Sequence, residues 1–137
     1  MDVLNPINWK RPKGYANGIA ATGRQIYVAG QIGWNVQEEF ETDDFAGQVK
    51  RALQNIVAVL NEGGAGPEHM TRMTWYIVDK KEYLAAARDI GQAYREIIGS
   101  NYPAMTLVQV ADLLEDRAKV EIEVTAVVPP SVDAVTD

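Results

Sequence analysis

The segment Lys119-Val120-Glu121-Ile122-Glu123-Val124-Thr125-Ala126 alternates apolar and polar side chains over eight residues. This period of two is typical of a strand with one buried face. Val120, Ile122 and Val124 share one face with Ala126, and Glu121 and Glu123 share the other with Lys119 and Thr125. We expect helices to cover the apolar face and other subunits to meet the mixed polar face.

Patterns elsewhere in the chain predict four more strands and two helices. With the strand above, the expected strands cover residues 15–21, 25–32, 69–78, 106–110 and 118–128. The first expected helix begins after an N-cap at Asp43 or Asp44, and the second spans residues 82–98. Gly63 and Gly64 end the first helix. The order β-β-α-β-α-β-β predicts an α+β fold, with both helices on one face of a mixed sheet. We expect one domain over residues 1–137, with an irregular lead-in at 1–14 and a loose tail at 131–137.

The composition narrows the classes of function. The net charge is −6, and no cluster of Lys or Arg forms a basic surface, so we expect no binding of nucleic acid. The chain has no cysteine and a single histidine, which predicts no metal site, and we expect no cofactor. No signal peptide and no apolar stretch of about 20 residues is recognisable, so we expect a cytoplasmic protein with no membrane contact.

Several segments carry a resemblance to one family. They are Tyr102-Pro103-Ala104-Met105-Thr106, Ile26–Ile32 (IYVAGQI), Gln48 with Ala52–Ile56 (ALQNI), Thr74–Asp79 (TWYIVD) and Glu121–Glu123. In this order they resemble the RidA/YjgF family of enamine and imine deaminases, over roughly residues 15–128. The resemblance implies a chorismate-mutase-like fold and a homotrimer with three clefts. Each cleft is lined by two neighbouring subunits.

The resemblance also implies site residues. In the catalytic branch of the family, an arginine after Pro-Ala binds the substrate carboxylate, a glutamate activates water, and a tyrosine and a serine line the pocket. This chain retains the glutamate as Glu121 and the tyrosine as Tyr15, together with Gly30. It has Met105 at the arginine position, Ala29 at the serine position and Gly91 where an asparagine is usual. The pattern resembles branches of the family that lack the arginine.

Glu121 is the candidate catalytic residue. Deamination of an imine requires water delivered to the C=N carbon and a proton delivered to the nitrogen, and a carboxylate in a partly dry cleft can do both. Alternatively, Glu121 and Glu123 face solvent or pair with Lys119.

Met105 decides how a substrate is recognised. Methionine has no donor for a carboxylate, so an imino acid needs another cation. The candidates are Arg11, Arg24, Arg72 and Arg117. Alternatively, Met105 belongs to an apolar pocket for a neutral or aromatic ligand, or packs in the core or an interface.

Two aromatic residues, Trp75 and Tyr76, are neighbours on the expected central strand and therefore face opposite sides of it. Whichever faces the cleft can stack on a planar ligand. The predicted substrate-binding set is Tyr15, Ala29, Gly30, Trp75, Met105 and Thr106.

These residues support two functions. The first is deamination of a small enamine or imine without the usual arginine, of which the 2-aminomuconate deaminases of aromatic catabolism are one type. The second is a non-catalytic trimer that binds a small ligand or regulates another process. The acidic charge disfavours the endoribonuclease activity sometimes attributed to the family.

Overall fold

The computed structural model describes residues 1–131, and the predicted tail beyond Ser131 lies outside the described residues. The elements in chain order are β1 (Asp2–Leu4), β2 (Gly18–Ala20), β3 (Arg24–Ile32), α1 (Phe45–Glu62), a 3-10 turn (Pro67–His69), β4 (Met70–Ile77), α2 (Lys80–Ala85), α3 (Ala87–Ile97), β5 (Ala104–Gln109) and β6 (Val120–Val128). No helix in residues 1–131 has the length and apolar character needed to cross a membrane.

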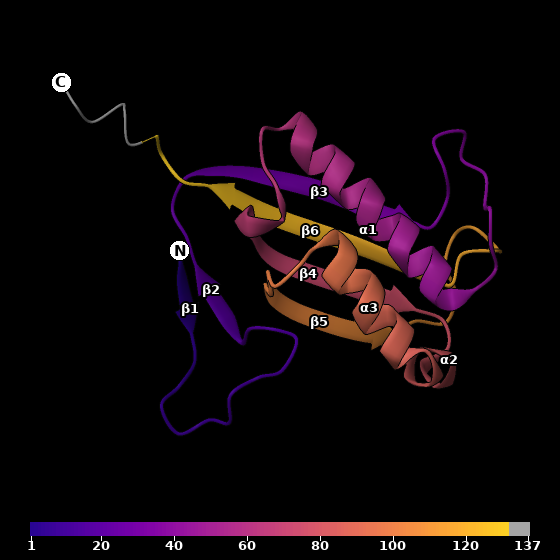
Figure 1. Cartoon of the computed structure of the whole chain (residues 1–137), viewed down its shortest axis with the longest axis horizontal. Helices are drawn as coiled ribbons and strands as arrows, with labels where there is room; N and C mark the ends of the chain where they lie inside the picture. Colours follow the sequence, from indigo (N-terminus) through magenta and orange to yellow (C-terminus); the bar gives the residue numbers. More distant parts are fainter. Residues whose placement is uncertain (132–137) are drawn as a thin grey trace.

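The main sheet has the strand order β3-β6-β4-β5. Strands β4 and β5 are parallel, and the other two pairs are antiparallel. A parallel pair needs a crossover, which α2 and α3 provide. Figure 1 shows α1 and α3 side by side on one face of this sheet, while the other face has no helix. The predicted α+β fold, with helices on one face of a mixed sheet, is confirmed.

Helix α1 forms where its apolar stripe and its caps predict. Asp44 is the N-cap, since its Oδ2 accepts a hydrogen bond from the Gly47 N–H (2.9 Å). Gly64 has a φ of +73°, a conformation that suits glycine at the end of a helix. The buried stripe of the helix comprises Phe45, Val49, Ala52, Leu53, Ile56 and Leu60. Each large side chain buried there contributes roughly 1.5–3 kcal/mol.

The stripe of α1 packs against the apolar face of β6. Val120, Ile122, Val124 and Ala126 are buried in this core, whereas Glu121 and Glu123 lie on the opposite face and are partly exposed. The alternation in residues 119–126 is therefore confirmed. It places both glutamates on the face of the sheet that has no helix.

The N-terminal segment differs from the prediction. Residues 1–14 are not wholly irregular, because β1 pairs antiparallel with β2 and forms a separate two-stranded sheet. The expected strand at 15–21 is therefore not a strand of the main sheet. A bridge from Ala16 to Ala104 links it to that sheet, with the Ala16 N–H donating to the Pro103 carbonyl (3.0 Å). Three-residue strands that pair over a long loop leave no local pattern in the sequence.

The predicted second helix, residues 82–98, consists of two helices. Asp79 caps α2 through hydrogen bonds from the Lys81 and Glu82 N–H groups, and α3 begins after Ala86. Alanine favours helix, so local propensity does not explain the break. We attribute it to packing: Tyr83 in α2 lies edge-on against Phe45 (centroids 6.2 Å apart), whereas α3 buries Ile90 and Tyr94.

Candidate functional site

Four of the predicted site residues, Gly30, Glu121, Trp75 and Met105, line two separate cavities of the structure. We call the first the sheet-face site; it is a cavity of about 240 Å³ lined by Gly30, Gln31, Ile32, Trp34, Leu114, Glu115 and Glu121. We call the second the α3 pocket; it is a cavity of about 250 Å³ lined by Lys13, Gly14, Trp75, Tyr83, Ala87, Ile90, Gly91, Tyr94, Arg95, Tyr102 and Met105. The two sets share no residue.

A β-bulge shapes the sheet-face site. Val28 lies opposite Val124 and Gln31 opposite Ile122, so two residues of β3, Ala29 and Gly30, oppose one residue of β6. The Gln31 side chain donates a hydrogen bond to the Ala29 carbonyl (3.2 Å). Bulges turn the local strand and redirect its side chains, and they are frequent beside active sites.

Glu121 lies directly against Gly30. A Cβ added to Gly30 would fall 2.1 Å from Oε2 of Glu121, so only glycine leaves room for the carboxylate in this position. Leu114, on the rim of the same cavity, is 93% exposed. The carboxylate thus lies against a bare stretch of backbone, in a cavity with an exposed apolar side chain in its lining.

The two glutamates of β6 have different surroundings. The Tyr76 hydroxyl donates a hydrogen bond to Glu123 (2.5 Å), and this contact raises the pKa of Tyr76 above 10. Glu121 has no side-chain hydrogen bond or ion pair within residues 1–131. Lys119, the partner considered above, instead binds Glu82 (3.1 Å), so pairing of Glu121 with Lys119 is wrong. Of the two glutamates of β6, Glu121 is the one whose carboxylate is available to a ligand.

Met105 and Trp75 face the helices. Met105 lies opposite Met73 in the parallel register and packs, partly buried, against the core. Trp75 is only 3% exposed, so the aromatic residue that faces the side of Glu121 is its neighbour Tyr76. Thr106 is exposed opposite Thr74 on that same face. The structure therefore separates Met105 and Trp75 from Glu121, Gly30 and Thr106.

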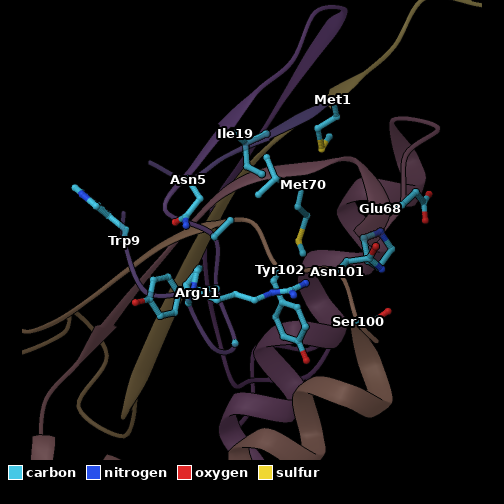
Figure 2. Close-up of a pocket in the computed structure, with 16 residues that line it drawn as sticks. Met1, Asn5, Trp9, Arg11, Ile19, Glu68, Met70, Ser100, Asn101 and Tyr102 are labelled. Carbon is cyan, nitrogen blue, oxygen red and sulfur yellow. The ribbon is translucent and has the colours of Figure 1, made fainter. Parts of the chain in front are cut away.

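Tyr15 lies in a third place. It lines a cavity of about 740 Å³ between the N-terminal strands and the end of α3, which Figure 2 shows. In that view Arg11 extends across the cavity towards Tyr102. This cavity shares Gly14 and Tyr102 with the α3 pocket, so the two are adjacent.

None of the four arginines proposed as substitutes lines the α3 pocket. Arg24 donates to the Gly63 carbonyl, Arg117 pairs with Asp43 (2.9 Å), Arg72 lies on the sheet face, and Arg11 lines the N-terminal cavity. The cations that do line it are Lys13 and Arg95, which the sequence interpretation missed. For Arg95 a signal existed: it follows Gly91 by four residues, so both occupy one face of a helix.

Polar side chains of α1 hold the loops around the sheet-face site. Gln48 is fully buried; its amide donates to the carbonyls of Thr42 and Arg117 and accepts from the Lys119 N–H. Asn55 donates to the carbonyls of Ile32 and Trp34. These contacts fix the end of β3 and the start of β6, which carry Gly30 and Glu121.

Within residues 1–131 no group of three or more His, Asp or Glu side chains is placed to hold a metal ion. His69 instead accepts a hydrogen bond from the Gly66 N–H (3.0 Å), so it serves the loop that precedes β4.

Comparison with known proteins assigns the family. The sequence model of the Endoribonuclease L-PSP family, to which the RidA/YjgF proteins belong, matches residues 9–128. The chain is a member of the RidA/YjgF family. A RutC family protein from Synechocystis is 33% identical, over 94% of this chain and 98% of the relative.

Two further RidA/YjgF relatives are similar to this chain, one with a named activity and the other with a solved structure. A 2-iminobutanoate/2-iminopropanoate deaminase from Dermatophagoides farinae is 29% identical, over 86% of this chain and 89% of the relative. The crystal structure of a Rid family protein of unknown function from Yersinia pestis superposes with a TM-score of 0.82, at 28% identity, over 93% of this chain and 98% of that one.

Proposed function

We propose that this protein is a deaminase of small imines or enamines, and that Glu121 is its general acid and base. The observation that carries the proposal is the unpaired carboxylate of Glu121, held against Gly30 at the β-bulge and open to a cavity. The relative named 2-iminobutanoate/2-iminopropanoate deaminase supports the reaction class.

We further propose that the site is completed by a second copy of the chain in a homotrimer. In one chain, Glu121 and Met105 line cavities that share no residue. The helix-free face also carries exposed apolar side chains, with Tyr27 71% exposed and Val108 41% exposed. An exposed apolar surface of this kind favours association. In a trimer, the sheet-face site of one subunit would face the α3 pocket of the next.

The proposed reaction is hydrolysis. Glu121 accepts a proton from a water molecule as the water oxygen bonds to the C=N carbon and the C=N π electrons move to the nitrogen. The carboxylic acid then gives this proton to the nitrogen, which completes the carbinolamine. Glu121 next takes the proton of the carbinolamine hydroxyl and passes it to the amino group, so that the C–N bond breaks, ammonia leaves, and the carbon becomes a carbonyl. Glu121 ends the cycle in the form in which it began.

A non-catalytic, ligand-binding trimer is the second candidate. The observation that favours it is the chemistry of positions 105 and 29, where Met105 has no strong donor and Ala29 has no hydroxyl. The aromatic-catabolism deaminase type has no support among these relatives, and it stays a prediction from the sequence resemblance.

The test is ammonia release from a panel of 2-imino acids and neutral enamines. We expect Glu121→Gln to lower turnover by about 10²–10⁴, the usual contribution of a general acid–base. Glu123→Gln is the matched control, two residues away on the same strand face, and we expect it to retain turnover within about threefold because Tyr76 occupies that carboxylate.

Two outcomes would contradict the proposal. One is equal activity of Glu121→Gln and the wild type. The other is an inactive wild type together with an active Met105→Arg variant, which would favour the non-catalytic trimer. Mass measurement in solution tests the assembly separately, and a monomer would reject the shared cleft.

A further inference from the structure

The charge of the α3 pocket is opposite to that of the chain. The chain carries a net charge of −6, yet the pocket is lined by two cations, Lys13 and Arg95, and by no Asp or Glu. Two carboxylates of α2 and α3 have other partners, since Glu96 binds Lys50 (3.0 Å) and Glu82 binds Lys119 (3.1 Å). Within residues 1–131 Arg95 forms no ion pair. Its charge is available to a ligand.

Glycine at position 91 gives Arg95 its place. A Cβ added to Gly91 would lie 3.4 Å from Nη1 of Arg95, so the guanidinium lies over the bare helix turn. A longer side chain at this position would compete with the guanidinium for that space. Gly91 and Arg95 thus act together: the small residue makes room for the cation beside Met105 and Trp75.

Trp75 places an unpaired polar group within the wall of the pocket. Its Nε1 is the one buried side-chain nitrogen or oxygen in residues 1–131 that has no hydrogen-bond partner. Burial of an unpaired N–H costs about 1–3 kcal/mol, so native structures usually provide an acceptor for it. The residue that carries this donor is in the wall of the α3 pocket.

The rest of the pocket wall is aromatic and apolar. Tyr94 and Tyr102 stack with centroids 5.5 Å apart and an interplanar angle of 6°. Burial raises the pKa values of Tyr83 and Tyr94 above 10, so both hydroxyls are neutral at physiological pH and add no negative charge. Flat rings favour a planar ligand.

We propose that the α3 pocket binds the carboxylate of a planar, unsaturated acid, with Arg95 as the cation and with the buried Trp75 indole N–H in the same wall as a reporter of binding. Lys13 adds charge at the rim. Arg95 would then be a specificity-determining residue that reaches the pocket from α3, in a chain whose β5 carries Met105. This assignment rests on the proposed function only in treating the acid as the substrate.

The test is titration of the ¹⁵N-labelled protein with benzoate, with the neutral benzamide as a comparison. The readout is the Trp75 indole N–H signal, assigned with Trp9→Phe and Trp34→Phe variants. We expect saturable shifts with benzoate and at least about tenfold weaker binding by Arg95→Gln, while Arg95→Lys stays within about threefold of wild type. Benzamide binding should not respond to Arg95→Gln.

Arg88→Gln is the matched control. Arg88 is exposed on the same helix and does not line the pocket, and its replacement by glutamine removes the same charge as Arg95→Gln. We expect this variant to bind benzoate as wild type does. The proposal is overturned if the Trp75 signal shows no saturable shift, if Arg95→Gln binds benzoate normally, or if Arg88→Gln weakens binding equally.

The same variants distinguish failure of this proposal from failure of the deaminase proposal. Turnover that depends on Glu121 but has an unchanged KM in Arg95→Gln would retain the deaminase and reject the carboxylate site. If benzoate binding depends on Arg95 but the protein releases no ammonia from any substrate, the carboxylate site is retained and the deaminase is rejected.

Discussion

The sheet-face site and the α3 pocket lie on opposite faces of the main sheet, and they carry opposite charges, with carboxylates in the first and cations in the second. Tyr76 pairs with Glu121 across β4 and β6, and the adjacent pair is Trp75 with Ile122. Neighbouring residues of β4 therefore face different surroundings: Tyr76 lies on the face with the two carboxylates of β6, and Trp75 lines the pocket with two cations. Because successive side chains of a strand point to opposite faces, a single chain cannot bring the two together.

This difference explains why a cleft between subunits suits the site residues. The sheet-face site offers a proton acceptor without a cation in its lining, and the α3 pocket offers cations without an acid. An imino acid requires both, a proton acceptor near its C=N carbon and a cation for its carboxylate. In the homotrimer that we propose, the two regions would come from different copies and would complement each other.

We expect the largest change in stability from Gln48→Leu, which removes hydrogen bonds to the loops around the sheet-face site. The variant leaves the carbonyls of Thr42 and Arg117 and the Lys119 N–H without their partner. We expect a loss of about 3 kcal/mol in unfolding free energy, and a melting temperature lower by on the order of 10 °C. Urea unfolding measures the first and calorimetry the second.

Gln54→Leu is the control for this prediction, since Gln54 is exposed on the same helix. Its unfolding free energy should change by less than about 0.5 kcal/mol. Equal effects of the two substitutions would show that the buried hydrogen bonds of Gln48 do not hold the loops.

Substitution of one glycine in each region gives the next largest effect. Gly30→Ala pushes the flexible carboxylate of Glu121 away, so we expect about tenfold lower turnover, equivalent to ~1.4 kcal/mol. Gly91→Ala lies in α3, where alanine favours helix, and it should raise the unfolding free energy by about 0.5–1 kcal/mol. Steady-state kinetics and urea unfolding measure these two outcomes.

A double mutant checks the reason for the Gly30 effect. In a Glu121→Gln background Gly30→Ala should cost little further activity, because the catalytic carboxylate is already absent. Additive losses would mean that Gly30 acts through something other than Glu121.

The smallest expected effect is on the pKa values of two tyrosines, Tyr76 on the helix-free face and Tyr94 in the α3 pocket, which are raised for different reasons. A hydrogen bond to Glu123 raises the pKa of Tyr76, whereas burial raises that of Tyr94. We therefore expect Glu123→Gln to lower the Tyr76 pKa towards 10 and to leave Tyr94 unchanged. Titration of the tyrosine Cζ signals by ¹³C NMR measures both.

The sign of the accompanying pH dependence follows from the same shifts. The folded protein holds these hydroxyl protons more tightly than the unfolded chain does. The stability they contribute is complete below about pH 10 and is lost as the pH rises through the raised pKa values of the folded state. A Tyr76 pKa that does not respond to Glu123→Gln would contradict the assignment to the hydrogen bond.

Much of the fold could be predicted because its signals are local. The apolar spacing of α1, its Asp44 cap and the glycines at its end all lie within one segment, and so does the alternation of β6. The pairing of β1 with β2 and the break at Ala86 had no such signal. Both depend on contacts between residues distant in sequence.

The candidate site was less predictable for a related reason. The sequence identified Glu121, Gly30 and Met105 one by one, but it did not show that Gly30 touches Glu121 or that Arg95 lies beside Met105. Those relations depend on strand register and on the placement of α3.

By itself, the sequence determined the relation between faces for two pairs: Glu121 shares a face with Glu123, and Trp75 lies opposite to Tyr76. In β6 the apolar set also predicted which face the helices cover, whereas for Trp75 and Tyr76 only the tertiary structure decided it. Both residues are aromatic, so the alternation of β4 places them on opposite faces without saying which face the helices will cover. Packing of α1 and α3 decides this, and it buries Trp75 and Met105 on one side while it leaves Glu121 open on the other.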